Sequence, residues 1–110
     1  MNQDNKVAIV TGGASGFGAS IAMRLGQSGV AVMVADLHAQ GAQRIADEIN
    51  GGGGRASAIA CDVSREQDVR AMVDAAVREL GGLHVMVNNA GATHRNKPAL
   101  QVSEAEFDRV

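Results

Sequence analysis

The chain has 110 residues, of which 45% are hydrophobic and 20% charged, and its formal net charge at pH 7 is −2. This length fits one domain at most, and the charge balance excludes the basic surface typical of proteins that bind nucleic acids or anionic membranes. No apolar stretch approaches the roughly 20 residues of a membrane span, and no secretory leader is recognisable, so we expect a cytoplasmic protein.

The first apolar segments predict a strand, a helix and a second strand. Residues 7–10 form a short apolar run bounded by Thr-Gly-Gly, which indicates a buried strand. Residues 16–28 repeat apolar positions at helical spacing, and Gly29 supplies a stop signal. Residues 30–35 are apolar without alternation and end at Asp36, as expected of a parallel strand covered on both faces.

A helix with apolar positions at 42, 45, 46 and 49 follows, and it leads into a glycine-rich run over residues 50–54. We expect a flexible surface loop in this run. A phosphate cradle is the alternative, although the run ends a helix rather than beginning one. Residues 56–61 predict a third strand, in which the single cysteine, Cys61, is expected to be a buried structural thiol in a reducing compartment.

The next segment predicts a long helix and a fourth strand. Ser64 and Gln67 have capping-box spacing, and an apolar stripe with a period of 3.6 residues runs from Val69 to Leu80. Two glycines end this helix, and residues 84–87 predict the fourth strand.

A last helix is expected to begin near residue 103. Ser103 and Glu106 repeat the capping-box spacing, and Val102 and Phe107 are placed as a hydrophobic staple. The alternation of strands and helices predicts an α/β fold with a parallel sheet, right-handed crossovers and helices on both faces. The outer edge of the fourth strand would then be open, which favours aggregation.

The stretch TGGASGFG lies between the first strand and its helix. Such a turn forms an anion site, because the first N–H groups of a helix lack partners and the helix dipole is positive there. Gly12 can make the sharp turn, Gly16 can let the backbone approach a pyrophosphate, and Gly18 can let the helix pack close to the strand. The hydroxyls of Thr11 and Ser15 add hydrogen-bonding capacity. The spacing differs from G-x-G-x-x-G, so a purely conformational role is the alternative.

Asp36 ends the second strand 18 residues after Gly18. At about this offset an acidic side chain meets the adenosine ribose of a dinucleotide. A carboxylate there accepts hydrogen bonds from the 2′- and 3′-hydroxyls of NAD and repels the 2′-phosphate of NADP. No basic residue lies in the glycine turn or directly after Asp36, and His38 is expected to be a surface residue, so the sequence predicts NAD over NADP.

Together, TGGASGFG, Asp36, the CDV of residues 61–63 and the NNAG of residues 88–91 resemble the N-terminal half of a short-chain dehydrogenase/reductase. The resemblance covers nearly the whole chain. It implies a Rossmann-like doubly wound parallel sheet of which the first four strands are present, followed by the start of a further helix. Residues 1–110 would be the N-terminal part of a single NAD(P)-binding domain, cut before its catalytic half.

The resemblance also implies a set of cofactor contacts. For the pyrophosphate they are Gly12, Ser15, Gly16, Phe17 and Gly18 of the turn, and for the adenosine ribose they are Asp36 and Leu37. For adenine they are Asp62 and Val63, and for the nicotinamide-side ribose they are Asn89, Ala90 and Gly91.

Several of these positions have a second interpretation. Phe17 stands where the family more often has an aliphatic residue. Asp62 could be an ordinary acid near a helix N-terminus, and Asn88 and Asn89 could brace the end of the sheet. The polar residues 94–97 lie near the expected substrate entrance, but they could simply be solvated.

The family's chemistry is hydride transfer between a nicotinamide and a secondary alcohol or ketone, with a Tyr-x-x-x-Lys pair, a serine and an asparagine at the active site. This chain contains no tyrosine. We therefore expect no catalytic residue and no metal site within it, the catalytic residues beyond Val110, and no activity from these 110 residues alone. The family also implies a homo-oligomer. A non-catalytic dinucleotide-binding or interaction module is the alternative.

Overall fold

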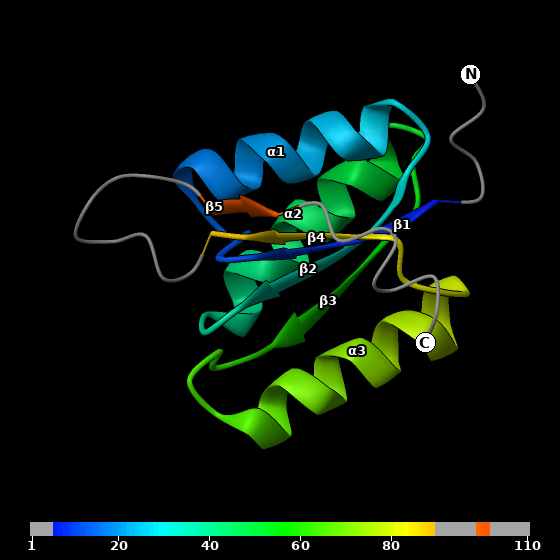
Figure 1. Cartoon of the computed structure of the whole chain (residues 1–110). Coiled ribbons are helices and arrows are strands. Elements are labelled where there is room, and N and C mark those ends of the chain that lie inside the picture. Colours follow the sequence, from blue (N-terminus) through cyan, green and yellow to red (C-terminus); the bar gives the residue numbers. More distant parts are fainter. Residues whose placement is uncertain (1–5, 90–98, 102–110) are drawn as a thin grey trace.

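The computed structural model describes residues 6–89 and 99–101, and these form one sheet with helices on both faces (Figure 1). In chain order the elements are β1 (Val7–Thr11), α1 (Gly16–Gln27), β2 (Ala31–Asp36), α2 (Ala39–Gly51), β3 (Ala56–Ala60), α3 (Glu66–Leu80), β4 (Val85–Asn88) and β5 (Ala99–Gln101). The strand order is β3-β2-β1-β4-β5, with β1 to β4 parallel. The predicted α/β fold with a parallel sheet is confirmed.

The central strand β1 is fixed by its two neighbours. It pairs with β2 from Val7 opposite Ala31 to Thr11 opposite Ala35, and with β4 on its other edge. All five residues of β1 are buried, as are the first five of β2. Strands covered on both faces need apolar side chains at every position, which explains why these runs show no alternation.

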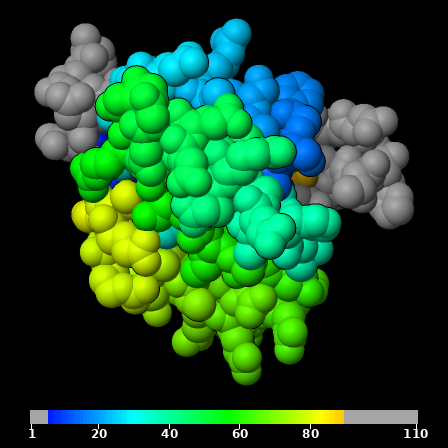
Figure 2. Space-filling view, turned by 180° about the vertical axis from the view of Figure 1, so that it is seen from behind, coloured from blue at the N-terminus to red at the C-terminus, as the bar shows by residue number. Residues whose placement is uncertain are grey.

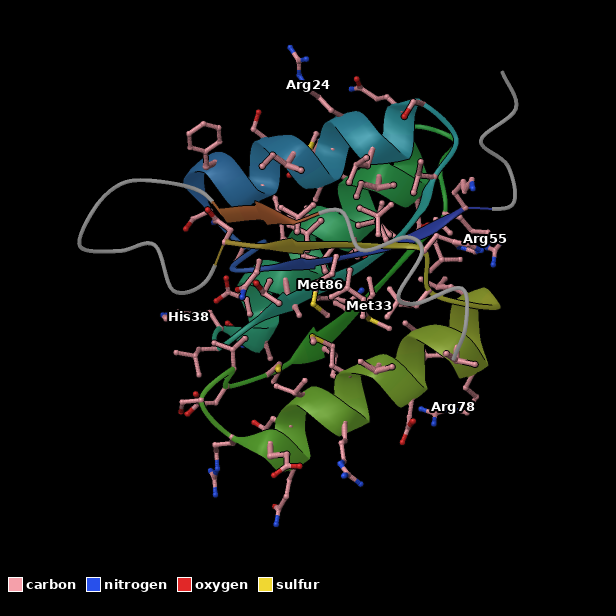
Figure 3. The ribbon with its side chains drawn as sticks, in the orientation of Figure 1. Arg24, Met33, His38, Arg55, Arg78 and Met86 are labelled. Atoms are coloured by element: carbon pink, nitrogen blue, oxygen red, sulfur yellow. The ribbon has the colours of Figure 1, made fainter. Side chains whose placement is uncertain are left out.

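The core has two layers, one on each face of the sheet. One layer lies between the sheet and α3, where Met33 of β2 packs with Met72 and Leu80 of the helix. Figure 3 shows Met33 and Met86 between the sheet and this helix. The other layer lies under α1 and α2. The sheet is thereby held between helices, and its strand ends remain available.

The helices α1 and α2 pack side by side over one face. A Cβ atom on Gly26 of α1 would lie 2.6 Å from Cγ2 of Ile49 on α2, so this glycine permits the close approach of the two helices. Seen from behind, α2 lies in the middle of the molecule, between the blue residues of α1 and the yellow-green residues of α3 (Figure 2). No helix in residues 6–89 or 99–101 is long and apolar enough to cross a membrane.

The structure adds one strand to the four that the sequence predicts. The strand β5 pairs with β4 in antiparallel fashion, from Met86 opposite Gln101 to Asn88 opposite Ala99, so the edge of β4 is covered rather than open. A strand of three residues is too short to show a periodic pattern, so the sequence did not predict it. The helix expected from residue 103 lies outside the described residues.

Two local predictions were wrong. The helix α3 begins at Glu66 after the N-cap Arg65, so Ser64 lies one residue before the cap, where its hydroxyl donates to Asp62. Asn50 belongs to α2 rather than to a loop, and its side chain makes a pair of hydrogen bonds with the backbone of Ala56. In both cases the end of the helix is set by local polar hydrogen bonds, which apolar periodicity does not register.

Candidate functional site at the carboxyl ends of the strands

The carboxyl ends of β1, β2 and β4 meet at one edge of the sheet and enclose a cleft. Its cavity volume is about 360 Å³. The lining residues are Gly12, Ser15, Asp36, Leu37, Cys61, Asp62, Val63 and Asn89. All of these except Cys61 are among the predicted cofactor contacts, so the structure brings together residues from four separate motifs.

The glycine turn between β1 and α1 depends on missing side chains. Gly12 and Gly16 have φ angles of 65° and 58°, in the left-handed region that favours glycine. A Cβ on Gly18 would lie 2.0 Å from the carbonyl oxygen of Gly12, whereas one on Gly16 would meet nothing within 4 Å. The prediction for Gly18 was wrong in its partner, because the close approach is to the carbonyl of the glycine turn rather than to the strand.

The helix α1 begins directly at this turn. Ser15 is its N-cap and is exposed, and its side chain makes no capping hydrogen bond. The N–H groups of the first turn are therefore not capped by this hydroxyl, and the helix dipole is positive here. A phosphate group fits this arrangement. Phe17, which follows, is 60% exposed and lies outside the cleft lining.

Asp36 connects the end of β2 to the glycine turn. Its Oδ2 accepts a hydrogen bond from the N–H of Ala14 at 3.0 Å, and its Oδ1 accepts one from the N–H of His38 at 2.9 Å. The Asp36 side chain is 14% exposed, whereas that of His38 is 81% exposed, as predicted for a surface residue. Leu37 is also exposed and lines the cleft.

A hydrogen-bond network closes the other side of the turn. The hydroxyl of Thr11 bonds to Oδ1 of Asn88 at 3.0 Å and accepts the N–H of Asn89 at 3.0 Å, and Nδ2 of Asn89 donates to the carbonyl of Gly12. The predicted bracing role of the two asparagines is confirmed. Thr11 is buried in this network, so its hydroxyl serves the sheet end instead of facing an anion. The predicted contacts Ala90 and Gly91 lie outside the described residues, as do residues 94–97.

The far wall of the cleft comes from the segment after β3. Asp62 accepts two hydrogen bonds from Ser64, one from the hydroxyl and one from the N–H, and these bonds, with nearby Arg65, lower the pKa of the Asp62 carboxyl. Asp62 is therefore an anion at neutral pH. The neighbouring Val63 is 37% exposed at the cleft.

The thiol of Cys61 lies at the base of this wall. It is buried, as predicted, and its burial raises its pKa, with further contributions from Asp68 and Asp62. The group is therefore a neutral thiol near pH 7, which suits packing rather than nucleophilic chemistry. Within the described part of the chain, no cluster of His, Cys, Asp and Glu is suited to a metal ion.

The sequence did not predict two features of the cleft. Ala14 donates its N–H to Asp36, and Cys61 lines the cleft. Nothing in an alanine side chain reports a main-chain hydrogen bond, so Ala14 had no detectable signal. Cys61 could have been placed at the cleft, because it directly precedes the predicted contact Asp62.

The sequence and the structure were compared with known proteins. The family model described as short chain dehydrogenase matches residues 6–110. The chain is similar to 4-formylbenzenesulfonate dehydrogenase TsaC1/TsaC2 of Comamonas testosteroni, with 70% identity over all of this chain and 44% of the relative. It is 42% identical to 7alpha-hydroxysteroid dehydrogenase of Escherichia coli K12, over 80% of this chain and 34% of the relative.

Two solved structures are similar to this chain in fold. A crystal structure of hydroxysteroid dehydrogenase from Escherichia coli superposes with a TM-score of 0.77 and 40% sequence identity, over 80% of this chain and 37% of that one. A short-chain type dehydrogenase/reductase from Mycobacterium marinum superposes with a TM-score of 0.73 and 39% identity, over 77% and 34% of the two chains. The chain spans less than half the length of these relatives. The family match over nearly all of its residues shows that the chain belongs to the short-chain dehydrogenase family.

Proposed function

We propose that the chain is the cofactor-binding, N-terminal part of a single NAD(P)-binding domain in an NAD-dependent oxidoreductase. Membership of the family implies a nicotinamide dinucleotide as cofactor. The observation that carries the proposal is the Asp36 carboxylate, which lies in the same cleft as the glycine turn at the N-terminus of α1. One end of this cleft suits phosphate and the other suits ribose hydroxyls.

The preference for NAD follows from the charges at the cleft. The charged side chains among its lining residues are the carboxylates of Asp36 and Asp62. A 2′-phosphate beside Asp36 would meet like charge, whereas ribose hydroxyls would find an acceptor. The His38 side chain is 81% exposed, with its Nδ1 3.7 Å from Oδ1 of Asp36, and it is not among the residues that line the cleft.

In the proposed complex each part of the cleft has a separate task. The pyrophosphate is held by main-chain groups of Gly12, Ser15, Gly16, Phe17 and Gly18. The adenosine ribose is held by Asp36 and Leu37, and adenine is contacted by Asp62 and Val63. The nicotinamide-side ribose is lined by Asn89, Ala90 and Gly91. The bound dinucleotide supplies the carbon that gives or accepts a hydride. Holding the cofactor in one orientation is this chain's contribution to rate.

Proton transfer requires residues that this stretch lacks. It contains no tyrosine, and we place the tyrosine, lysine, serine and asparagine of the family's active site after Val110. The 110 residues alone would then be inactive, because losing general acid–base catalysis costs about 10²–10⁴-fold before the missing substrate pocket is counted. In this proposal the whole protein is a cytoplasmic homo-oligomer.

The substrate belongs to the carbonyl and alcohol class. The names of the relatives include a formyl-bearing sulfonate, cyclohexanol and a 7alpha-hydroxysteroid. We favour a secondary alcohol or ketone. The absence of tyrosine supports one alternative, a non-catalytic dinucleotide-binding module. Reading the coding DNA beyond the codon for Val110 separates the two, because a continuation with Tyr-x-x-x-Lys supports the enzyme and an immediate stop codon supports the module.

The binding proposal is tested by titrating the protein with NAD and NADP in a calorimeter. We expect NAD to bind at least about tenfold more tightly than NADP, as expected when a carboxylate faces a phosphate. Gly18→Ala should weaken NAD binding by at least about tenfold and lower the free energy of unfolding by about 1–3 kcal/mol, because the added Cβ overlaps the Gly12 carbonyl.

The matched control is Gly51→Ala at the end of α2, where an added Cβ meets nothing within 4 Å. This variant should bind NAD like the wild type. Equal affinity of the Gly18 variant and the wild type, or tighter binding of NADP than of NAD, would contradict the proposal.

A further inference from the structure

We infer that Asp36 is a positioning residue for the glycine turn, in addition to its contact with the adenosine ribose. The inference rests on the proposed function and deepens it. In the ribose role alone, the carboxylate would act only on the dinucleotide's hydroxyl groups. The hydrogen bonds of Asp36 point to a second role, in which it sets the shape of the turn that receives the pyrophosphate.

The turn is attached to the end of β2 at two consecutive N–H groups. The N–H of Gly13 donates to the carbonyl of Ala35 at 3.1 Å, and the N–H of Ala14 donates to Oδ2 of Asp36 at 3.0 Å. The first bond is between main-chain groups and would survive any side-chain substitution. The second depends entirely on the carboxylate, so the side chain of Asp36 controls how the middle of the turn is held.

The carboxylate is itself held in place before any ligand arrives. Its Oδ1 accepts the N–H of His38 at 2.9 Å, which directs Oδ2 toward Ala14. Ala14 is 7% exposed, and it also lies close to α2, where a Cβ added to Gly41 would be 3.0 Å from the Ala14 side chain. The turn thus lies close to both the carboxylate and α2, with little room to move if the hydrogen bond is kept.

Both roles are compatible with the chemistry of one carboxylate. Its two oxygens offer about four acceptor positions, and two are taken by the N–H groups of Ala14 and His38. The remaining positions can accept the ribose hydroxyls. An alanine at position 36 would remove all of them together, so a substitution intended to admit NADP would also loosen the pyrophosphate turn and weaken both dinucleotides.

The test uses an NAD analogue whose adenosine ribose lacks the 2′- and 3′-hydroxyls. Neither the wild type nor Asp36→Ala can make carboxylate–hydroxyl bonds to this analogue, so a difference in affinity between them reports the turn. We expect Asp36→Ala to bind the analogue about five- to tenfold more weakly than the wild type, the effect of losing one hydrogen bond. Equal affinity would assign the carboxylate to the ribose alone and overturn the inference.

A second measurement needs no dinucleotide. In the ligand-free protein, the amide of Ala14 should exchange its hydrogen about tenfold faster in Asp36→Ala, a larger acceleration than that of the amides of Ile9 and Met33 in the sheet, which report the change in global stability. A purely global loss of stability would accelerate all of them alike. Unchanged exchange at Ala14 would contradict the inference even if no dinucleotide binds the wild type, whereas absence of binding would contradict the proposed function only.

Two further variants complete the design. Asp36→Asn keeps the size of the side chain but replaces one carboxylate oxygen with an NH2 donor. Because Ala14 and His38 bond to different oxygens, one of them loses its acceptor and should exchange faster. Protection of both would count against the inference. Asp74→Ala removes the same charge from an exposed position on α3 and should leave both readouts unchanged.

Discussion

Three aspartates around the cleft accept hydrogen bonds from main-chain N–H groups. Asp36 bonds to Ala14 and His38, Asp62 to Ser64, and Asp68 to the N–H of Asp62. The sequence predicted the first two as ligand contacts, with an ordinary acid near a helix N-terminus as the alternative for Asp62, and it predicted none of these main-chain hydrogen bonds. Motif spacing locates an acid at a strand end, whereas its main-chain partners depend on loop conformation, which no side chain in the pattern reports.

The buried thiol of Cys61 makes stability depend on pH in the alkaline range. Its folded pKa lies above the ordinary value of 9.0, because burial and the nearby aspartates disfavour the thiolate. Above the unfolded pKa, the unfolded chain releases a proton that the folded chain retains, so the free energy of unfolding should fall as pH rises from about 8.5 through 9.5. Urea denaturation at a series of pH values measures this slope.

Cys61→Ala is the control for this prediction, because it is the single cysteine and no tyrosine is present to titrate in the same range. The variant should lose most of the decline between pH 8.5 and 9.5. An identical decline in the wild type and the variant would mean that another group is responsible.

At the scale of elements, apolar periodicity located every helix of the described region and misplaced some of its ends. The stripe on α3 was predicted correctly, since Met72, Ala76 and Leu80 are all buried. Its start was not, because Ser64 lies one residue before the N-cap. Periodicity reports which face of a helix is buried. The residue at which the helix begins depends instead on the local conformation and hydrogen bonds of the few residues before it.

The pairing of β1 with β4 is extended by a side chain just before β4. Nδ1 of His84 accepts the N–H of Val7 at 3.0 Å, and the N–H of His84 donates to the carbonyl of Val7 at 2.8 Å. We expect His84→Ala to lower the free energy of unfolding by about 1–2 kcal/mol, because the Val7 N–H loses its acceptor. Urea denaturation measures this change, and hydrogen exchange at Val7 localises it.

His84→Asn offers an acceptor oxygen on a shorter side chain, so it should be less destabilising than the alanine variant. Equal losses in the two variants, with Val7 exchange unaffected, would show that packing of the imidazole rather than its hydrogen bond matters at this position.

At the scale of the whole molecule, the sequence predicted the parallel sheet and its two covered faces because long apolar runs leave few other arrangements. It did not predict β5, whose three residues carry no periodic signal. The sequence also predicted which motifs would meet at the cleft. Parallel strands place their carboxyl ends at one edge, so residues from separate motifs had to converge there.

The same topology predicts an ordered pattern of stability across the sheet. The strand β1 is paired on both edges and wholly buried, whereas β3 is the outer strand on its side and its residues are partly exposed. In native-state hydrogen exchange, we expect Ile9 and Val10 to exchange only on global unfolding, and amides of β3 to exchange at least about tenfold faster. Equal protection of both strands would show that the sheet opens as a single unit.

The central place of β1 also affects how the protein is made. Thr11 and Gly12 leave the ribosome early, yet their partners Asn88 and Asn89 follow 77 residues later. At about 5–20 residues per second, synthesis separates the two groups by about 4–15 seconds. During this interval β1 can pair with β2, but its other edge has no β4 beside it. The nascent chain thus presents an apolar strand edge to chaperones, and the wall that Asn89 adds to the cleft forms last.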